Sequence, residues 1–81
     1  MKFNDREFEP VESSNIKGMA YDEETKSLFI IFKTNSVYQY LDVPQALYED
    51  FKNAESKGRF LNFYIRGNYT FKHLGTYTEE L

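Results

Sequence analysis

Few side chains in this sequence could carry out covalent chemistry. Nucleophilic catalysis needs an activated serine, threonine or cysteine beside a base, and the chain has no cysteine and a single histidine, His73. Because His73 follows Phe71 and Lys72 in a terminal segment, we interpret it as a surface or sheet-edge histidine with no catalytic task. We therefore expect no enzymatic activity.

The same inventory argues against a bound metal or cofactor. A structural zinc site takes four ligands, mostly cysteine and histidine, which one histidine cannot supply. Asp22, Glu23 and Glu24 are adjacent rather than alternating as in a calcium-binding loop, so we expect a solvated turn. The four glycines are scattered instead of clustered before a helix, which is unlike a phosphate-binding loop.

Binding chemistry is better supported, in the second half of the chain. Residues 51–75 hold five cations against one acid, whereas residues 1–25 hold seven acids against three cations, within a net charge of −3. Cations attract phosphates and aromatic rings stack on unpaired bases, which is how single-stranded nucleic acids are held. The candidate nucleic-acid-binding residues are Lys57, Arg59, Tyr64, Arg66, Tyr69, Lys72, Tyr38 and Tyr40.

These residues predict a small non-catalytic module that binds tRNA or single-stranded RNA, with an affinity that falls steeply with added salt. A structural interpretation stands beside this one. Phe60 and Phe63 suit the core of a helix, and paired strand tyrosines such as Tyr38 and Tyr40 often fill a core with their hydroxyls at its rim.

The stretch Ser27–Val43 must position these side chains, and it has the pattern of a β-hairpin. Two β-rich runs flank the turn formers Thr34, Asn35 and Ser36. A two-residue turn would pair Phe32 with Val37. We favour a three-residue loop with Asn35 in the left-handed conformation, which pairs Ile30 with Tyr38 and Leu28 with Tyr40.

The favoured register leaves a second sheet face that is too apolar to be ignored. Its residues are Phe29, Ile31, Val37 and Leu41, with Gln39 among them. Part of the N-terminal lead-in covers this face, or a protein partner or a second copy of the chain does. A protein-interaction or self-association module is therefore the alternative function.

The rest of the chain completes an α+β prediction. A first strand lies within 14–22 with an irregularity at Gly18, a helix runs from a cap at Asp42 or Val43 to about Glu55, and a shorter helix after Gly58 covers 59–66. We predict a three-stranded antiparallel meander, two helices packed on one sheet face, and a short C-terminal extended segment over 69–77. Residues 1–10 form a loosely attached lead-in.

Length and composition set the class. Eighty-one residues form one domain, 1–81, because a chain of this size cannot divide its core. The absence of cysteine, of a signal-peptide pattern and of a long apolar run predicts a soluble, cytoplasmic protein with no membrane partner.

The order of several motifs resembles the KTSC domain, a family found as a C-terminal extension of some lysyl-tRNA synthetases. The matching residues are Ser13-Ser14-Asn15-Ile16, Tyr21-Asp22, Leu28, Ile30, Phe32, the central Val37-Tyr38-Gln39-Tyr40, Val43-Pro44, Tyr48, Ala54, Ser56, Gly58, Phe60, Asn62 and Ile65. They place a KTSC-like core at about 11–74. Because the family occurs as an extension of a tRNA ligase, the resemblance implies RNA binding, which is an argument by association.

Overall fold

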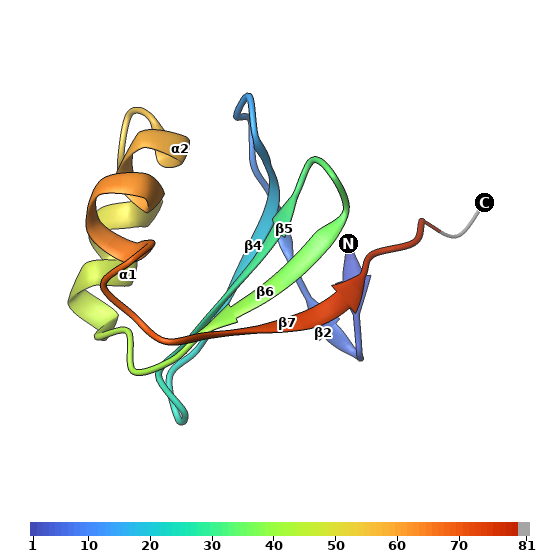
Figure 1. Ribbon diagram of the computed structural model, residues 1–81, viewed down its shortest axis with the longest axis horizontal. Helices are drawn as coiled ribbons and strands as arrows, with labels where there is room; N and C mark the ends of the chain where they lie inside the picture. The colour runs from blue at the N-terminus through green and yellow to red at the C-terminus, as the bar shows by residue number, and fades with distance from the viewer. Residues whose placement is uncertain (80–81) are drawn as a thin grey trace.

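The computed structural model describes residues 1–79 and has an α+β fold built on a five-stranded antiparallel sheet (Figure 1). The sheet order is β3-β4-β5-β6-β7, and a separate two-stranded sheet, β1-β2, precedes it. The strands are β1 (Lys2–Phe3), β2 (Arg6–Glu7), β3 (Glu9–Pro10), β4 (Ile16–Asp22), β5 (Ser27–Phe32), β6 (Ser36–Tyr40) and β7 (Phe71–Thr76). The helices are α1 (Gln45–Lys52), α2 (Lys57–Phe60) and one π-helical turn, η1 (Leu61–Ile65).

The predicted three-stranded meander is therefore wrong, although the α+β class and the central β4-β5-β6 strands are present. The expected C-terminal extended segment is a six-residue strand, β7, which pairs with β6 along its length. At the other edge, β3 adds two residues against β4. The strand β3 was missed because two residues show no periodicity, whereas β7 lies within the extended segment predicted over 69–77.

The predicted hairpin register is confirmed. Leu28 lies opposite Tyr40 and Ile30 opposite Tyr38, and Asn35 has the left-handed backbone conformation (φ 72°) that the three-residue loop requires. The register shift between Ile16 and Gly18 in β4 also confirms the expected irregularity. The alternation of side chains along these strands therefore correctly predicted which residues share a face of the sheet.

The helices differ in detail from the prediction. Asp42 is left-handed (φ 58°) and α1 begins after Pro44, with no side-chain cap. Gly58 lies inside α2 instead of ending a helix, because Ser56 caps α2 by accepting a hydrogen bond from the Arg59 N–H (3.4 Å). The helical layer covers one face of the sheet (Figure 1), where the main core is formed by Val11, Ile16, Met19, Leu28, Ile30, Tyr40, Val43, Tyr48, Phe51, Leu61 and Ile65.

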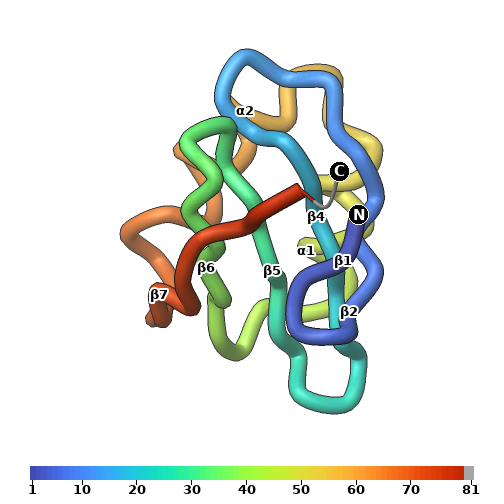
Figure 2. Tube along the Cα trace, turned by 90° about the vertical axis from the view of Figure 1, so that its right-hand side faces the viewer, coloured from blue at the N-terminus to red at the C-terminus, as the bar shows by residue number. Residues whose placement is uncertain are grey.

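The opposite face of the sheet is covered by the chain itself. Residues 1–10, expected to be a loose lead-in, fold into β1, β2 and β3, and Figure 2 shows the β1-β2 hairpin lying in front of β4. The second core consists of Phe8, Ala20, Phe29, Ile31, Val37 and Tyr77, with Met1, Phe3 and Leu74 packed against it. Phe29, Ile31 and Val37 are buried and Leu41 is half-buried, so the face on which the protein-interaction alternative depended is already occupied.

Candidate nucleic-acid interface

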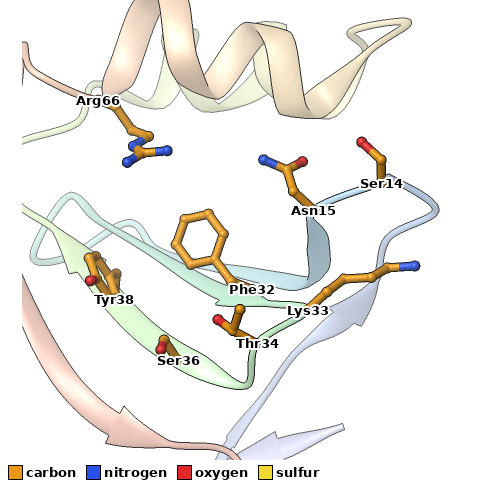
Figure 3. A pocket seen from close by; sticks show the side chains of 8 residues that line it. All are labelled: Ser14, Asn15, Phe32, Lys33, Thr34, Ser36, Tyr38 and Arg66. Atoms are coloured by element: carbon orange, nitrogen blue, oxygen red, sulfur yellow. The ribbon is translucent and has the colours of Figure 1, made fainter.

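An open cleft of about 360 Å³ lies between the helical layer and the tip of the β5-β6 hairpin (Figure 3). Its lining combines aromatic rings, hydroxyls, an amide and two cations, and none of the lining side chains is acidic. The eight residues are Ser14, Asn15, Phe32, Lys33, Thr34, Ser36, Tyr38 and Arg66.

Arg66 lies above the rings, and the Asn15 side chain rises from the start of β4 with its amide nitrogen toward Arg66 (Figure 3). The π-helical turn η1 ends when the Arg66 N–H donates to the Leu61 carbonyl (2.8 Å), five residues back, and Arg66 itself is extended. This exit from η1 turns the Arg66 side chain away from the helical axis and over the sheet. Arg66 Nη1 donates to Asn62 Oδ1 (3.2 Å), which leaves its other guanidinium donors free to face the cleft.

The floor of the cleft is formed by Phe32 and Tyr38. Phe71 and His73 contact Tyr38 outside the cleft, and these four rings are here called the aromatic surface. Tyr38 is at its centre, with ring centroids 5.4 Å from Phe32, 5.3 Å from Phe71 and 5.1 Å from His73. Tyr38 and Phe71 are nearly parallel (12°), and Phe71 remains 53% exposed at the sheet edge. Rings held this way on a sheet present a stacking surface to solvent.

A second, shallower depression of about 430 Å³ lies on the other side of Phe71. It is lined by Gly67, Asn68, Tyr69, Thr70 and Phe71. Since Tyr38 borders the cleft and Phe71 borders this depression, the stacked Tyr38–Phe71 pair connects the two. The result is one continuous aromatic path across β6 and β7.

The structure brings only some of the predicted site residues to this path. Tyr38 and Arg66 line the cleft, and Tyr69 lines the second depression while also packing on the main core. Tyr40 is 2% exposed, so it is a core residue. Burial raises the pKa of the Tyr40 phenol, and the nearby Arg66 guanidinium opposes this rise.

The remaining predicted residues lie elsewhere. Lys57 bonds the Ala54 carbonyl (3.4 Å), Arg59 is exposed on α2, and Tyr64 packs its ring against Phe60 (4.7 Å). Lys72 lies opposite Gln39 in the β6-β7 ladder, so strand alternation places it on the other sheet face from Phe71 and His73. Phe63, interpreted as a core residue, is 74% exposed.

Sequence reasoning missed Phe32, Phe71 and His73 as members of the aromatic surface, and Asn15 and Ser36 as lining residues. The alternation of Phe71 and His73 was visible in the sequence. Recognising it as part of the site required knowing that β7 pairs with β6, with Tyr38 opposite His73 and Tyr40 opposite Phe71. The polar lining residues carry no sequence signal of their own.

Two common kinds of site are absent from the part of the chain that the structure describes. Within residues 1–79, no three histidine, cysteine, aspartate or glutamate side chains gather closely enough to hold a metal ion. Over the same residues, no helix has the length and apolarity needed to cross a membrane.

Comparison with known proteins identifies the family. The sequence model of the KTSC domain matches residues 12–69. A lysine–tRNA ligase of Nostoc punctiforme is 43% identical over 63 residues, which is 78% of this chain and 11% of the ligase. The chain therefore spans about one ninth of the length of that relative, and the match concerns a short segment of it.

Smaller relatives match over most of their length. A protein of Tsukamurella paurometabola is 36% identical over 61 residues, covering 75% of this chain and 91% of that protein. The crystal structure of a KTSC domain protein from Yersinia pestis superposes with a TM-score of 0.83 at 38% identity, covering 85% of this chain and 97% of the other. The eight residues that line the cleft all lie within the matched segment. The chain belongs to the KTSC domain family.

Proposed function

We propose that this KTSC domain binds single-stranded RNA along the path formed by the cleft, the Tyr38–Phe71 pair and the second depression. The observation that carries the proposal is the stacked Tyr38–Phe71 pair, half open to solvent, with Arg66 over one side of it. Phe71 contacts the core residue Tyr40 (6.0 Å between centroids) yet leaves about half of its side chain exposed. A solvent-facing ring beside a cation suits unpaired bases.

Base stacking on the exposed rings favours binding of a single strand over a duplex. Each base stacked on an aromatic side chain contributes about 1–3 kcal/mol, and Phe71 together with His73 offers room for such contacts at the edge of β7. Bases within a duplex are already stacked on one another and cannot reach a ring surface of this kind. Arg66 supplies a cation for the phosphates on the same side of the sheet.

The named relatives add an argument by association. The Nostoc punctiforme relative is a lysine–tRNA ligase, so a segment similar to this chain occurs in a protein that acts on an RNA. The similarity extends over 11% of that ligase, so the ligase reaction itself is not carried over to this chain.

The small number of cations at the cleft limits how steeply the binding constant falls with salt concentration. The net charge is −3, and only Lys33 and Arg66 border the cleft. For single strands the logarithm of the binding constant falls by about 0.7 per neutralised phosphate for each tenfold increase in salt. Two cations therefore predict a slope of about −1.4, which is shallower than the clustered cations of the sequence would have given.

The test is a titration of a short fluorescent oligouridine with the wild-type chain, followed by anisotropy. Phe71→Ala should weaken binding by about 1–3 kcal/mol, because one stacking ring is lost. The matched control is Phe63→Ala, which removes a ring that is even more exposed but does not belong to the aromatic surface. Equal losses for the two variants, or no binding by the wild type at low salt, would contradict the proposal.

A further inference from the structure

The polar groups of the cleft are almost all hydrogen-bond donors. Asn15 Oδ1 already accepts a hydrogen bond from the Ser13 hydroxyl (3.0 Å), while its amide nitrogen points into the cleft toward Arg66 (Figure 3). Asn15 therefore offers the cleft two N–H donors, while its amide oxygen faces Ser13 and Gly58. The Lys33 N–H donates to the backbone carbonyl of Asn15 (2.9 Å), which holds the backbone at this position. The side-chain oxygen has little room to move, because a Cβ atom added at Gly58 would lie 2.5 Å from it.

Within the described residues, the other polar lining groups make few contacts with the protein, apart from the Arg66–Asn62 hydrogen bond. Over residues 1–79, the hydroxyls of Ser14, Thr34 and Ser36 have no hydrogen-bond partner in the protein, and Lys33 and Arg66 have no acidic partner. Hydroxyls can donate or accept, the guanidinium and ammonium groups only donate. A ligand that fits this lining must present several acceptor oxygens and a negative charge.

Resting on the proposed RNA function, we propose that the cleft is a subsite for a phosphate monoester at the end of an RNA strand, with the attached base on the aromatic surface. A phosphate monoester carries a charge of about −1.5 to −2 at neutral pH and three acceptor oxygens. These match the two cations and the surplus of donors. A phosphodiester within a strand has one negative charge and two free oxygens, so it would leave much of this lining unpaired.

The volume of the cleft agrees with one terminal nucleotide. About 360 Å³ is at the lower end of the range of about 300–1,000 Å³ that small-molecule sites occupy. Phe32 and Tyr38 form an apolar wall inside the same cleft as Arg66 and Asn15, so a ring and a phosphate can be held at once. The strand then continues over Phe71 toward the second depression.

The experiment compares oligouridines of one length that carry a 5′-phosphate, a 3′-phosphate or hydroxyls at both ends. The wild-type chain should bind one of the phosphorylated strands about tenfold more tightly than the hydroxyl strand, since charge-assisted hydrogen bonds are the strong ones. Arg66→Gln should remove this preference. Arg59→Gln, an equal change of charge at an exposed position on α2 outside the cleft, should keep it.

A second variant tests the donors without removing a cation. Asn15→Asp keeps the shape and the oxygen that accepts from Ser13 but replaces the amide donors by a negatively charged oxygen. It should lose the preference for the phosphorylated strand while a thermal melt shows that the chain still folds. A variant that folds and retains the full preference would overturn the assignment of Asn15 as a phosphate ligand.

Free uridine 5′-monophosphate and uridine separate this proposal from the RNA proposal. If all strands bind equally, the phosphate subsite is wrong and RNA binding stands. If no strand binds but the monophosphate shifts the amide NMR signals of Asn15 and Ser36 while uridine does not, the subsite serves a free nucleotide and the RNA proposal is wrong. Failure of every ligand would overturn both.

Discussion

At the scale of single residues, the contact between Asn15 and Gly58 connects the loop before β4 to helix α2. A Cβ atom added at Gly58 would lie 2.5 Å from Asn15 Oδ1 and 3.4 Å from Ser13 Oγ. Asn15 Oδ1 in turn accepts from Ser13 Oγ (3.0 Å), and the Ser13 oxygen accepts from the Ile16 N–H (3.4 Å). Glycine is required at position 58 for space, since the helix itself needs no positive φ there.

Gly58→Ala should therefore destabilise the chain by about 1–3 kcal/mol, because overpacking forces neighbouring atoms to move. Urea unfolding of the variant measures this cost. The double variant Asn15→Ala with Gly58→Ala should lose less free energy than the sum of the single changes, since the clash disappears with the amide. Strict additivity would show that the two residues do not constrain each other.

The residues of the candidate site illustrate what a sequence shows and what it hides. Two of the candidate nucleic-acid-binding residues, Tyr38 and Arg66, line the same cleft. Tyr40 has the same type and a similar position yet is buried, because the helical layer covers its end of β6 and leaves Tyr38 partly open. Lys72 was placed with the other cations along the sequence, but strand alternation sends it to the opposite face.

At the scale of elements, the β5-β6 hairpin controls the cleft because its tip supplies Lys33, Thr34 and Ser36. Asn35 holds this tip in place. Its N–H donates to the Phe32 carbonyl (2.8 Å), its carbonyl accepts from the Tyr77 N–H (2.7 Å), and its side-chain oxygen accepts from Lys17 Nζ. The left-handed conformation (φ 72°) makes these three bonds compatible.

Replacing Asn35 separates conformation from hydrogen bonding. Asn35→Ala should cost about 1–2 kcal/mol more than Asn35→Gly, because only glycine adopts the left-handed region without a Cβ penalty. Both variants lose the Lys17 bond equally, so the difference reports the backbone alone. Thermal melting of the pair measures it, and equal midpoints would show that the tip relaxes out of the left-handed region.

The elements of the first ten residues were the least predictable part of the fold. Asn4 and Asp5 both have positive φ (50° and 64°) and form the turn between β1 and β2, a two-residue pair of the kind that favours tight hairpins. The flanking strands have two residues each, too few to show alternation. Their stability comes from tertiary contacts, including the Arg6 guanidinium over the Phe29 ring (4.4 Å) and its ion pair with Asp22 (3.1 Å).

At the scale of the whole molecule, tyrosines are an important part of the main core, and their ionisation couples stability to pH. Burial raises the pKa of Tyr40 and Tyr48, and burial with the nearby Glu23 and Asp22 carboxylates raises that of Tyr21. The Tyr21 hydroxyl donates to the Val43 carbonyl (2.5 Å), and its ring stacks on Tyr48 with centroids 4.5 Å apart.

The sign of the pH dependence follows from these shifts. A phenol whose pKa is higher in the folded state binds more protons there than in the unfolded chain, so stability falls as pH rises. The loss should begin above about pH 10, where unfolded tyrosines ionise, and stability below that pH should be unaffected by these groups. Urea midpoints across this range measure it. Tyr40→Phe should reduce the alkaline loss, and a variant that loses stability with pH as steeply as the wild type would contradict the assignment.

The segments that cover the two faces of the sheet differ in how far the family match includes them. The segment shared with the family, residues 12–69, includes the helical layer and the whole lining of the cleft, whereas the β1-β2 hairpin and Tyr77, which seal the second face, lie outside it. The family match thus includes the whole helical cover of one sheet face but only part of the cover of the other face. If a surface of a larger protein covered this face in place of the β1-β2 hairpin, the eight residues that line the cleft would keep their positions, because none of them belongs to the hairpin.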